Sequence, residues 1–189
     1  MHDLITSTTF EIPRGTPNLA AISLDMTTIY QAEDRLHDVR IATPNNAPEM
    51  MGYFNQVCNT VTKYLAWVEY EILQAKKYLE IAKASVILEK APEEFKRLKD
   101  VGIKYNEDFR EAMVIRDVDY QKRLDALNTL VAAKSWLEGK AWSFVRAYNS
   151  CRFVADNRSF TAASPNLTGT IGQTFNEPQQ NFMGKTKFD

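Results

Sequence analysis

Basic and aromatic side chains alternate in one segment near the end of the sequence, KAWSFVRAYNSCRFVADNR at residues 140–158. Cations bind phosphates and aromatic rings stack on bases, so this composition suits contact with single-stranded nucleic acid. Six residues turn a helix by about 600°, so cations spaced by six lie about 120° apart and form no continuous stripe. We therefore expect the segment to contact DNA only within an assembly of several chains. Its cations are Lys140, Arg146, Arg152 and Arg158.

A second group of cations lies within QAKKYLEIAKAS, residues 74–85. Lys76 and Lys83 are a heptad apart and share one face of a helix, whereas Lys77 shares that face only loosely. These three lysines are the best single candidates for contacts with DNA. The alternative interpretation is an ordinary solvated helix surface with intrahelical ion pairs, because Glu80 lies one turn from Lys76.

The sequence lacks the residue patterns of common catalytic and cofactor sites. Its two histidines, His2 and His37, both fall in the weakly patterned first segment, so no histidine triad or metal cage is expected. Glycine-rich phosphate-binding motifs and CxxC motifs do not occur. Asp117, Asp119 and Asp125 are interpreted as helix caps and solvated charges rather than as a metal site. We expect a protein that is not an enzyme and binds neither a cofactor nor a metal.

The elements that position the lysines can be predicted from apolar periodicity. Between residues 47 and 89, apolar side chains recur at steps of three and four, a coiled-coil seam with one extra four-residue step. A second helix is predicted over residues 106–157, with a broader apolar stripe and a cap or kink at Asp117 or Asp119. The seam consists of Phe54, Val57, Val61, Tyr64, Val68, Ile72, Ala75, Leu79, Ala82 and Val86. The stripe consists of Tyr120, Leu124, Leu127, Val131, Leu137, Ala141, Phe144, Tyr148, Cys151 and Ala155.

The charged segment at residues 90–103, broken by Pro92 and Gly102, is predicted to connect the two helices. We therefore predict an all-α fold, a long antiparallel helical hairpin with coiled-coil-like packing. Two helices cannot bury the apolar residues outside the seam and the stripe, which predicts an oligomer. These residues are Leu73, Ile81, Ile87, Leu130, Val145 and the candidate interface tryptophans Trp67, Trp136 and Trp142.

The two ends of the chain, residues 1–46 and 159–189, are predicted to have little structure of their own. Pro, Thr and Asn interrupt the first, apart from a short helix near residues 25–38, and the second is rich in Ser, Thr, Asn, Gln and Gly. The helical domain would cover residues 47–158. Without a secretion signal or a run of about 18 apolar residues, we expect a cytoplasmic protein with free cysteines and no membrane contact.

Between residues 63 and 158 the sequence resembles the UvsY-like recombination mediators of tailed bacteriophages. The shared order is QAKKYLEIAKAS in the first helix, a charged connection, the segment NEDFREAMVIRDVDY and the basic-aromatic run GKAWSFVRAYNSCRFVADNR. In the family's best-known member, basic residues of the first helix contribute to DNA binding. Lys83 matches one of those positions, and Ser85 stands where that member has a second basic residue. Lys76 and Lys77 are placed to compensate for Ser85.

The resemblance implies a protein that binds single-stranded DNA and assembles as a closed ring. It also implies displacement of the single-strand-binding protein so that a RecA-like recombinase can load, in the host cytoplasm if a phage encodes the chain. A ring would multiply a few lysines into a dense cationic surface, so a formal net charge of −1 per chain is no obstacle. The alternative is a structural or scaffolding coiled-coil protein of a phage that self-assembles without binding DNA.

Overall fold

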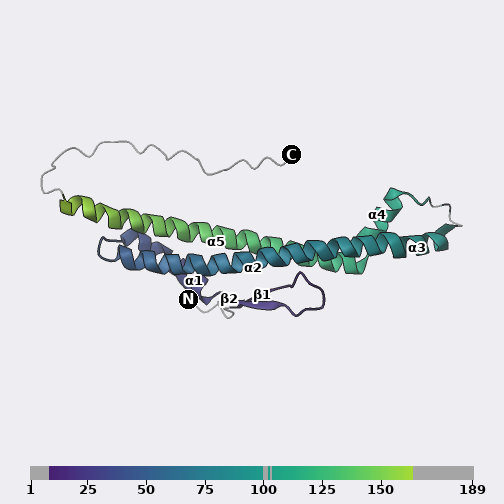
Figure 1. The fold of residues 1–189 in the computed structure, drawn as a ribbon, viewed down its shortest axis with the longest axis horizontal. Helices are drawn as coiled ribbons and strands as arrows, with labels where there is room; N and C mark the ends of the chain where they lie inside the picture. The colour runs from purple at the N-terminus through teal and green to yellow at the C-terminus, as the bar shows by residue number, and fades with distance from the viewer. Residues whose placement is uncertain (1–8, 100–101, 103, 164–189) are drawn as a thin grey trace, which may run out of the picture.

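The computed structural model describes residues 9–99, 102 and 104–163, with side chains described as far as Asn157. Two long helices lie side by side and give this part of the chain an elongated shape (Figure 1). Helices make up most of the described residues, as the sequence predicts. The predicted C-terminal tail lies outside the described residues from residue 164 on, whereas residues 159–163 belong to the last helix.

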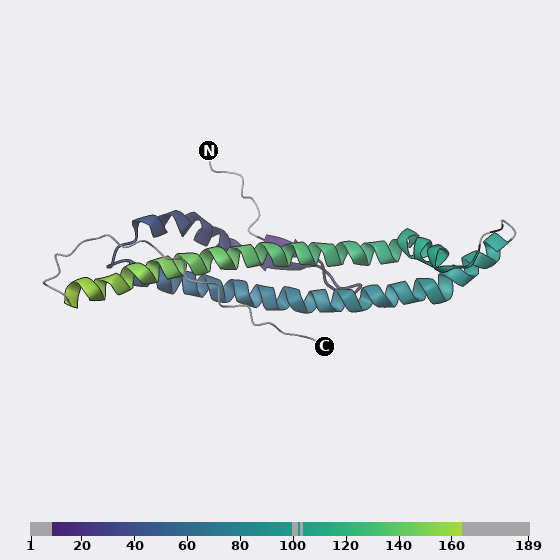
Figure 2. The same cartoon turned by 90° about the horizontal axis from the view of Figure 1, so that it is seen from above.

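The order of elements places two short strands and two short helices before the long helices. The elements are β1 (Thr9–Ile12), β2 (Ile22–Asp25), α1 (Thr27–Asp34), the 3-10 helix η1 (Arg35–Ile41), α2 (Ala47–Ser85), the π-helical segment η2 (Val86–Lys90), α3 (Ala91–Leu98), α4 (Glu107–Arg116) and α5 (Val118–Ala163). The α2 and α5 helices form most of the core, and the segment before α2 packs beside them (Figure 2).

The buried face of α2 follows the predicted apolar seam. Nine of its ten residues are buried, and the tenth, Tyr64, is partly buried. Steps of three and four residues keep these side chains on one side of a helix with 3.6 residues per turn. The hydroxyl group of Tyr64 donates to the carbonyl oxygen of Asp25 at 2.8 Å, so this edge of the seam contacts the N-terminal segment.

The α5 helix packs along the buried face of α2. The Phe54 ring stacks on the Phe144 ring with centroids 6.3 Å apart, and Lys134 Nζ lies 2.8 Å from Glu69 Oε1. Rising residue numbers in α2 therefore meet falling numbers in α5, so the two helices run in opposite directions (Figures 1 and 2).

The contact face of α5 differs from the prediction at two neighbouring residues. Leu130 is fully buried although it was predicted to lie outside the stripe, and Val131, predicted within it, is 48% exposed. Leu130, Ala133 and Leu137 follow one another at steps of three and four, and all three are buried. The prediction was wrong because both neighbours are apolar, so composition alone does not decide which of them faces α2.

The first long helical path passes the predicted end at residue 89 and reaches Leu98. Proline lacks an N–H group, and its ring clashes with the carbonyl group four residues earlier in a regular α-helix. The backbone widens just before Pro92 into η2, where the Ala91 N–H group donates to the carbonyl oxygen of Val86. This wider turn lets the helical path continue, and Pro92 lies in the first turn of α3.

A break at Asp117 divides the predicted second helix into α4 and α5. The backbone of Asp117 is extended, with φ −73° and ψ 121°, and its Oδ1 accepts the N–H group of Tyr120 at 2.9 Å. A side chain that accepts from the third residue ahead is an N-cap. The predicted cap or kink at Asp117 is therefore confirmed, and it divides the helical stretch predicted over residues 106–157 into α4 and α5.

Residues 9–46 have more regular structure than the sequence predicts. The strands β1 and β2 pair antiparallel with Ile12 opposite Ile22, and α1 and η1 contact the long helices. Each strand has only four residues, so its alternation is too short to be recognised in the sequence. The side chains that this segment contributes to the core are Ile12, Leu24, Met26, Ile29 and Ala32.

A buried carboxylate on α2 holds the N-terminal segment. Glu71 is fully buried, its Oε2 accepts the Gly15 N–H group at 2.7 Å, and its Oε1 lies 2.8 Å from Arg14 Nε. The contact with Arg14 lacks the direction of a hydrogen bond and acts as an ion pair. A buried carboxylate is costly unless it is paired, so these contacts fix the segment on α2. We call Arg14, Gly15 and Glu71 the N-terminal anchor.

Replacing Gly15 by alanine is expected to lower the free energy of unfolding by about 2 kcal/mol, a typical cost of overpacking. A Cβ atom there would lie 2.0 Å from the carbonyl oxygen of Glu71 and 2.6 Å from the backbone nitrogen of Ala75. Urea denaturation measures the change. The control is Gly52→Ala, because a Cβ atom at Gly52 would meet nothing within 4 Å beyond the adjacent backbone of its own helix. Equal stability of the Gly15 variant and the unmodified chain would contradict the close contact.

Candidate nucleic-acid interface

Three lysines project from the second half of α2 into solvent. The side chains of Lys76, Lys77 and Lys83 are exposed, and none forms an ion pair with another described residue. Lys76 and Lys83 lie about two turns apart on one helix face. Glu80, one turn from Lys76, makes no ion pair with it in the described part of the chain. The Lys77 ammonium group lies 5.8 Å from the ring centroid of Tyr78.

Lys140 of α5 has an acidic partner within the chain. Its ammonium group forms an ion pair with Glu33 of α1 and lies 4.9 Å from the ring centroid of Trp136. Lys134 lies six residues earlier on α5 and forms an ion pair with Glu69 of α2. The hydrogen bond to the Glu69 carboxylate is the main cause that raises the pKa of Lys134. Because both charges are already compensated, we leave Lys140 out of the proposed interface.

The remaining predicted cations of α5 differ in their surroundings. Arg146 is exposed and forms no ion pair with another described residue. Arg152 Nε lies 3.5 Å from Asp156 Oδ2, one helical turn ahead. Arg158 lies in α5, but the structure describes side chains only as far as Asn157. This end of α5 therefore offers one arginine, Arg146, without an ion pair to a described residue, whereas the second half of α2 offers three such lysines.

The three candidate interface tryptophans are exposed to different degrees. Trp142 is 67% exposed, Trp136 is partly covered by Lys140, and Trp67 packs against the core. The structure therefore places Trp67 mainly within the fold. Trp142 is the tryptophan with the most surface left for a partner.

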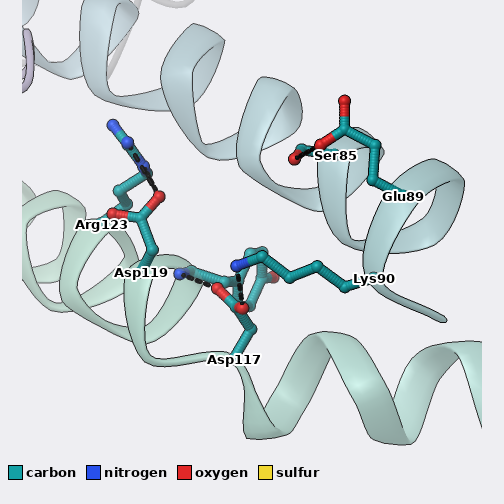
Figure 3. Close-up of polar contacts among 7 residues, drawn as sticks. Ser85, Glu89, Lys90, Asp117, Asp119 and Arg123 are labelled. Carbon is teal, nitrogen blue, oxygen red and sulfur yellow. Dashed lines mark hydrogen bonds and ion pairs between the residues drawn. The ribbon is translucent and has the colours of Figure 1, made fainter. Parts of the chain in front are cut away.

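Polar contacts brace the junction between η2 and α5. Lys90 of η2 forms an ion pair with Asp117, whose other carboxylate oxygen caps α5 (Figure 3). Two residues further along the chain, Asp119 accepts two hydrogen bonds from Arg123, at 2.9 and 3.0 Å (Figure 3). Both acids therefore have structural roles of the kind that the sequence predicts.

A cleft of about 510 Å³ opens beside this junction. Both positive and negative side chains line the cleft, and two of them, Lys90 and Asp117, form an ion pair with each other. We therefore assign the cleft no ligand. Its charged lining consists of Lys90, Arg116, Lys122, Glu94, Asp117 and Asp119.

The pairing with Lys90 makes the contribution of Asp117 dependent on pH. The hydrogen bond from Lys90 is the main cause that holds the pKa of Asp117 below its usual value. A carboxylate of this kind stabilises the fold above its unfolded-state pKa, about 4, and loses that effect as the pH falls through the folded-state pKa.

We expect Asp117→Ala to lower the free energy of unfolding by about 1 kcal/mol at pH 7, the usual cost of losing a cap. The difference from the unmodified chain should begin to shrink below about pH 4 and should largely disappear once the pH is below the lowered folded-state pKa of Asp117. Urea denaturation at pH 7, 4 and 2 measures both effects. A difference that is the same at all three pH values would show that the charge of Asp117 does not contribute.

The two cysteine thiols are candidate nucleophiles among the described residues. Cys58 and Cys151 are free, as the sequence predicts, and burial raises the pKa of both thiols. Raised pKa values keep the thiols protonated at neutral pH, which makes them poor nucleophiles. Within the same residues, no group of three or more His, Cys, Asp or Glu side chains could hold a metal ion.

Sequence reasoning missed an aromatic cluster at the far end of the molecule. The rings of Phe95, Tyr105 and Phe109 lie with their centroids 5.1 to 6.1 Å apart, and we call these three residues the tip cluster. The available signal was the presence of three aromatic residues around a charged connection. Tyr105 and Phe109 are four residues apart, but Phe95 belongs to α3, so the proximity of all three rings depends on how α3 and α4 meet.

Comparison with known proteins assigns the chain to no family. No protein-family model, curated protein or solved structure matches the chain. The resemblance to UvsY-like mediators therefore stays a prediction from the sequence. Across residues 9–99, 102 and 104–163, no helix is both long and apolar enough to cross a membrane.

Proposed function

We propose that this chain is a recombination mediator that binds single-stranded DNA through the lysines of α2, as a homo-oligomer. The observation that carries the proposal is the exposure of Lys76, Lys77 and Lys83 without an acidic partner among the described residues. Lys134 and Lys140, in contrast, are neutralised by carboxylates of the chain. An uncompensated lysine can replace a counterion on a phosphate, and the release of that counterion drives binding.

Local phosphate neutralisation explains how a chain with a formal net charge of −1 can hold a polyanion. Copies in an oligomer repeat the three lysines, and repeated weak contacts with one strand add up to high avidity. Contacts of this kind read the phosphate backbone and not the bases, so binding is independent of sequence.

Exposed apolar side chains on the two long helices support the oligomer. Trp142 and Phe153 of α5 and Leu73 of α2 are each more than half exposed. Large exposed apolar surface on a protein commonly marks an interface. We propose that α2 and α5 form a helical hairpin whose outer faces pack in a coiled-coil manner against other copies, leaving the α2 lysines open to solvent.

The mediator role follows from the resemblance to UvsY-like proteins. Mediators of that family assemble as closed rings and displace the single-strand-binding protein, which lets a RecA-like recombinase load. We propose a ring and the same two classes of protein partner for this chain, in the cytoplasm of the host cell.

Light scattering with and without an oligo-dT strand tests the proposal. We expect one oligomeric mass for the protein alone and a larger mass, increased by the bound strand, when DNA is added. A monomer would contradict the oligomer. An oligomer whose mass does not change with DNA would contradict the DNA-binding function and favour the alternative below.

A structural or scaffolding protein of a phage is the second candidate function. The exposed apolar faces favour it, because they provide surface for assembly whether or not DNA is present. A scaffold does not require free cations, so replacement of the α2 lysines would leave all of its interactions unchanged.

A further inference from the structure

The tip cluster combines buried and exposed aromatic surface. Tyr105 lies 5.1 Å from Phe95 and 5.9 Å from Phe109, measured between ring centroids, yet it is still 40% exposed. Part of the Tyr105 side chain therefore packs on its neighbours, and the rest faces solvent. An aromatic ring held in place by neighbouring rings offers a preorganised surface for another flat group.

A cleft of about 330 Å³ opens beside the tip cluster and is lined by Pro92, Phe95, Lys96, Lys99 and Tyr105. Its charged lining consists of the two lysines, both exposed and neither in an ion pair with another described residue. The volume lies at the lower end of the range for small-molecule sites, roughly 300–1,000 Å³. Flat apolar walls flanked by cations suit a ligand that has both an aromatic ring and a negative charge.

We propose that this cleft is a nucleobase-binding subsite, in which a base of the bound single strand stacks on Tyr105 while Lys96 and Lys99 contact its phosphates. The inference rests on the proposed function and adds a second contact region to it. The α2 helix continues through η2 into α3 (Figure 1). The α3 residues that line the cleft therefore lie on the same helical path as Lys83. A rise of 1.5 Å per residue places it about 20 Å beyond Lys83, a distance that a few nucleotides cover.

Charge at the tip favours a nucleotide over an apolar side chain of another protein. An apolar side chain in the cleft would bring no partner for Lys96 or Lys99, whereas each nucleotide brings a phosphate with its base. Glu94 of α3 does not offset these lysines. Its side chain lines the cleft beside Lys90 and Asp117, and its Oε2 lies 3.5 Å from Arg97 Nη1.

Two substitutions of Tyr105 separate the effect of its ring from that of its hydroxyl group. Tyr105→Leu removes the ring, and we expect it to weaken oligo-dT binding about tenfold in fluorescence anisotropy, a typical effect of losing one stacked base. Tyr105→Phe keeps the ring and loses only a 3.5 Å contact with the carbonyl oxygen of Ile87, so it should bind like the unmodified chain. The salt dependence should be unchanged in both variants, because no phosphate contact is lost.

Equal affinity of Tyr105→Leu and the unmodified chain would overturn the subsite and leave the proposed function intact. An unmodified chain that does not bind oligo-dT would overturn both. Weakening by Tyr105→Leu with an equal loss in Tyr105→Phe would assign the effect to the hydroxyl group and overturn stacking.

Photo-cross-linking of the unmodified chain gives a result that does not depend on the folding of a variant. The probe is an oligo-dT strand in which one thymine is replaced by 5-iodouracil, a base that cross-links to aromatic rings on which it stacks. We expect the cross-linked peptide to come from residues 92–109. Cross-links confined to other parts of the chain would overturn the subsite.

Discussion

Replacing Lys76, Lys77 and Lys83 together by glutamine is expected to weaken oligo-dT binding at least about a hundredfold. Each substitution removes one phosphate contact per chain, and an oligomer repeats the loss in every copy. These lysines are exposed and lack ion pairs among the described residues, so the fold does not depend on them. Fluorescence anisotropy measures the affinity, and light scattering should give the oligomeric mass of the unmodified chain.

A second triple variant controls for the change in net charge. Replacing the exposed residues Asn55, Asn59 and Asn128 by glutamate changes the charge of each chain by the same amount, at other places on α2 and α5. We expect this control to bind within about threefold of the unmodified chain, because salt screens charges that lie far from the strand. Equal weakening by both variants would contradict a local lysine site. Loss of the oligomer in the lysine variant would show that the lysines stabilise the assembly instead.

Glu71→Ala is expected to lower the free energy of unfolding by about 3 kcal/mol, because removing one partner of a buried ion pair is strongly destabilising. The substitution leaves the Gly15 N–H group without its acceptor and Arg14 without its counter-charge. It also leaves a cavity in the fully buried space that the Glu71 side chain occupies. Urea denaturation followed by circular dichroism measures the loss.

The matched control is Glu69→Ala, two residues away on the same helix. Glu69 is also in an ion pair, with Lys134, but its side chain is exposed and the pair lies at the surface. Surface ion pairs contribute little to stability, so we expect only a small change. A larger loss for Glu69→Ala than for Glu71→Ala would show that the N-terminal anchor does not hold the fold together.

The long helices could be predicted from the sequence because their signal is local and repeated many times. The predicted seam repeats at ten positions from Phe54 to Val86, and nine of these side chains are buried. Where the signal was weak, the prediction was wrong, as for Leu130 and Val131 on the broader stripe of α5. Pro92 was interpreted as an end of the helix, because the wider π-helical turn that lets the chain pass it leaves no mark in residue types.

The N-terminal segment could not be predicted because its structure depends on contacts that are distant in the sequence. Gly15 and Glu71 are 56 residues apart, and the contact between them fixes the loop between β1 and β2 on α2. Glu71 lies in a run of ordinary helix-forming residues, so nothing local marks it as buried. Its charge favours the opposite prediction, an exposed side chain.

The candidate interface could be predicted only where its residues lie close together in the sequence. Spacing on a single helix was enough to group Lys76 with Lys83, and the structure leaves both free. Lys140 looked equally suitable, but its partner Glu33 is 107 residues away in the sequence. Glu33 belongs to α1, a helix that the sequence predicts near residues 25–38 without indicating that it packs beside α5. The tip cluster was missed because Phe95 lies in α3, within the segment predicted as a connection, and Tyr105 lies ten residues later, just before α4.

The salt dependence of oligo-dT binding by the unmodified chain tests the central claim most directly. Each phosphate neutralised on a single strand contributes about −0.7 to the slope of log K against log salt concentration, so three lysines predict a slope of about −2 or steeper. Anisotropy titrations between 50 and 300 mM NaCl, roughly the range over which counterion release is strong, measure this slope. Steep weakening of binding with salt is the predicted result. No binding at low salt, or binding that does not change with salt, would contradict the proposed function.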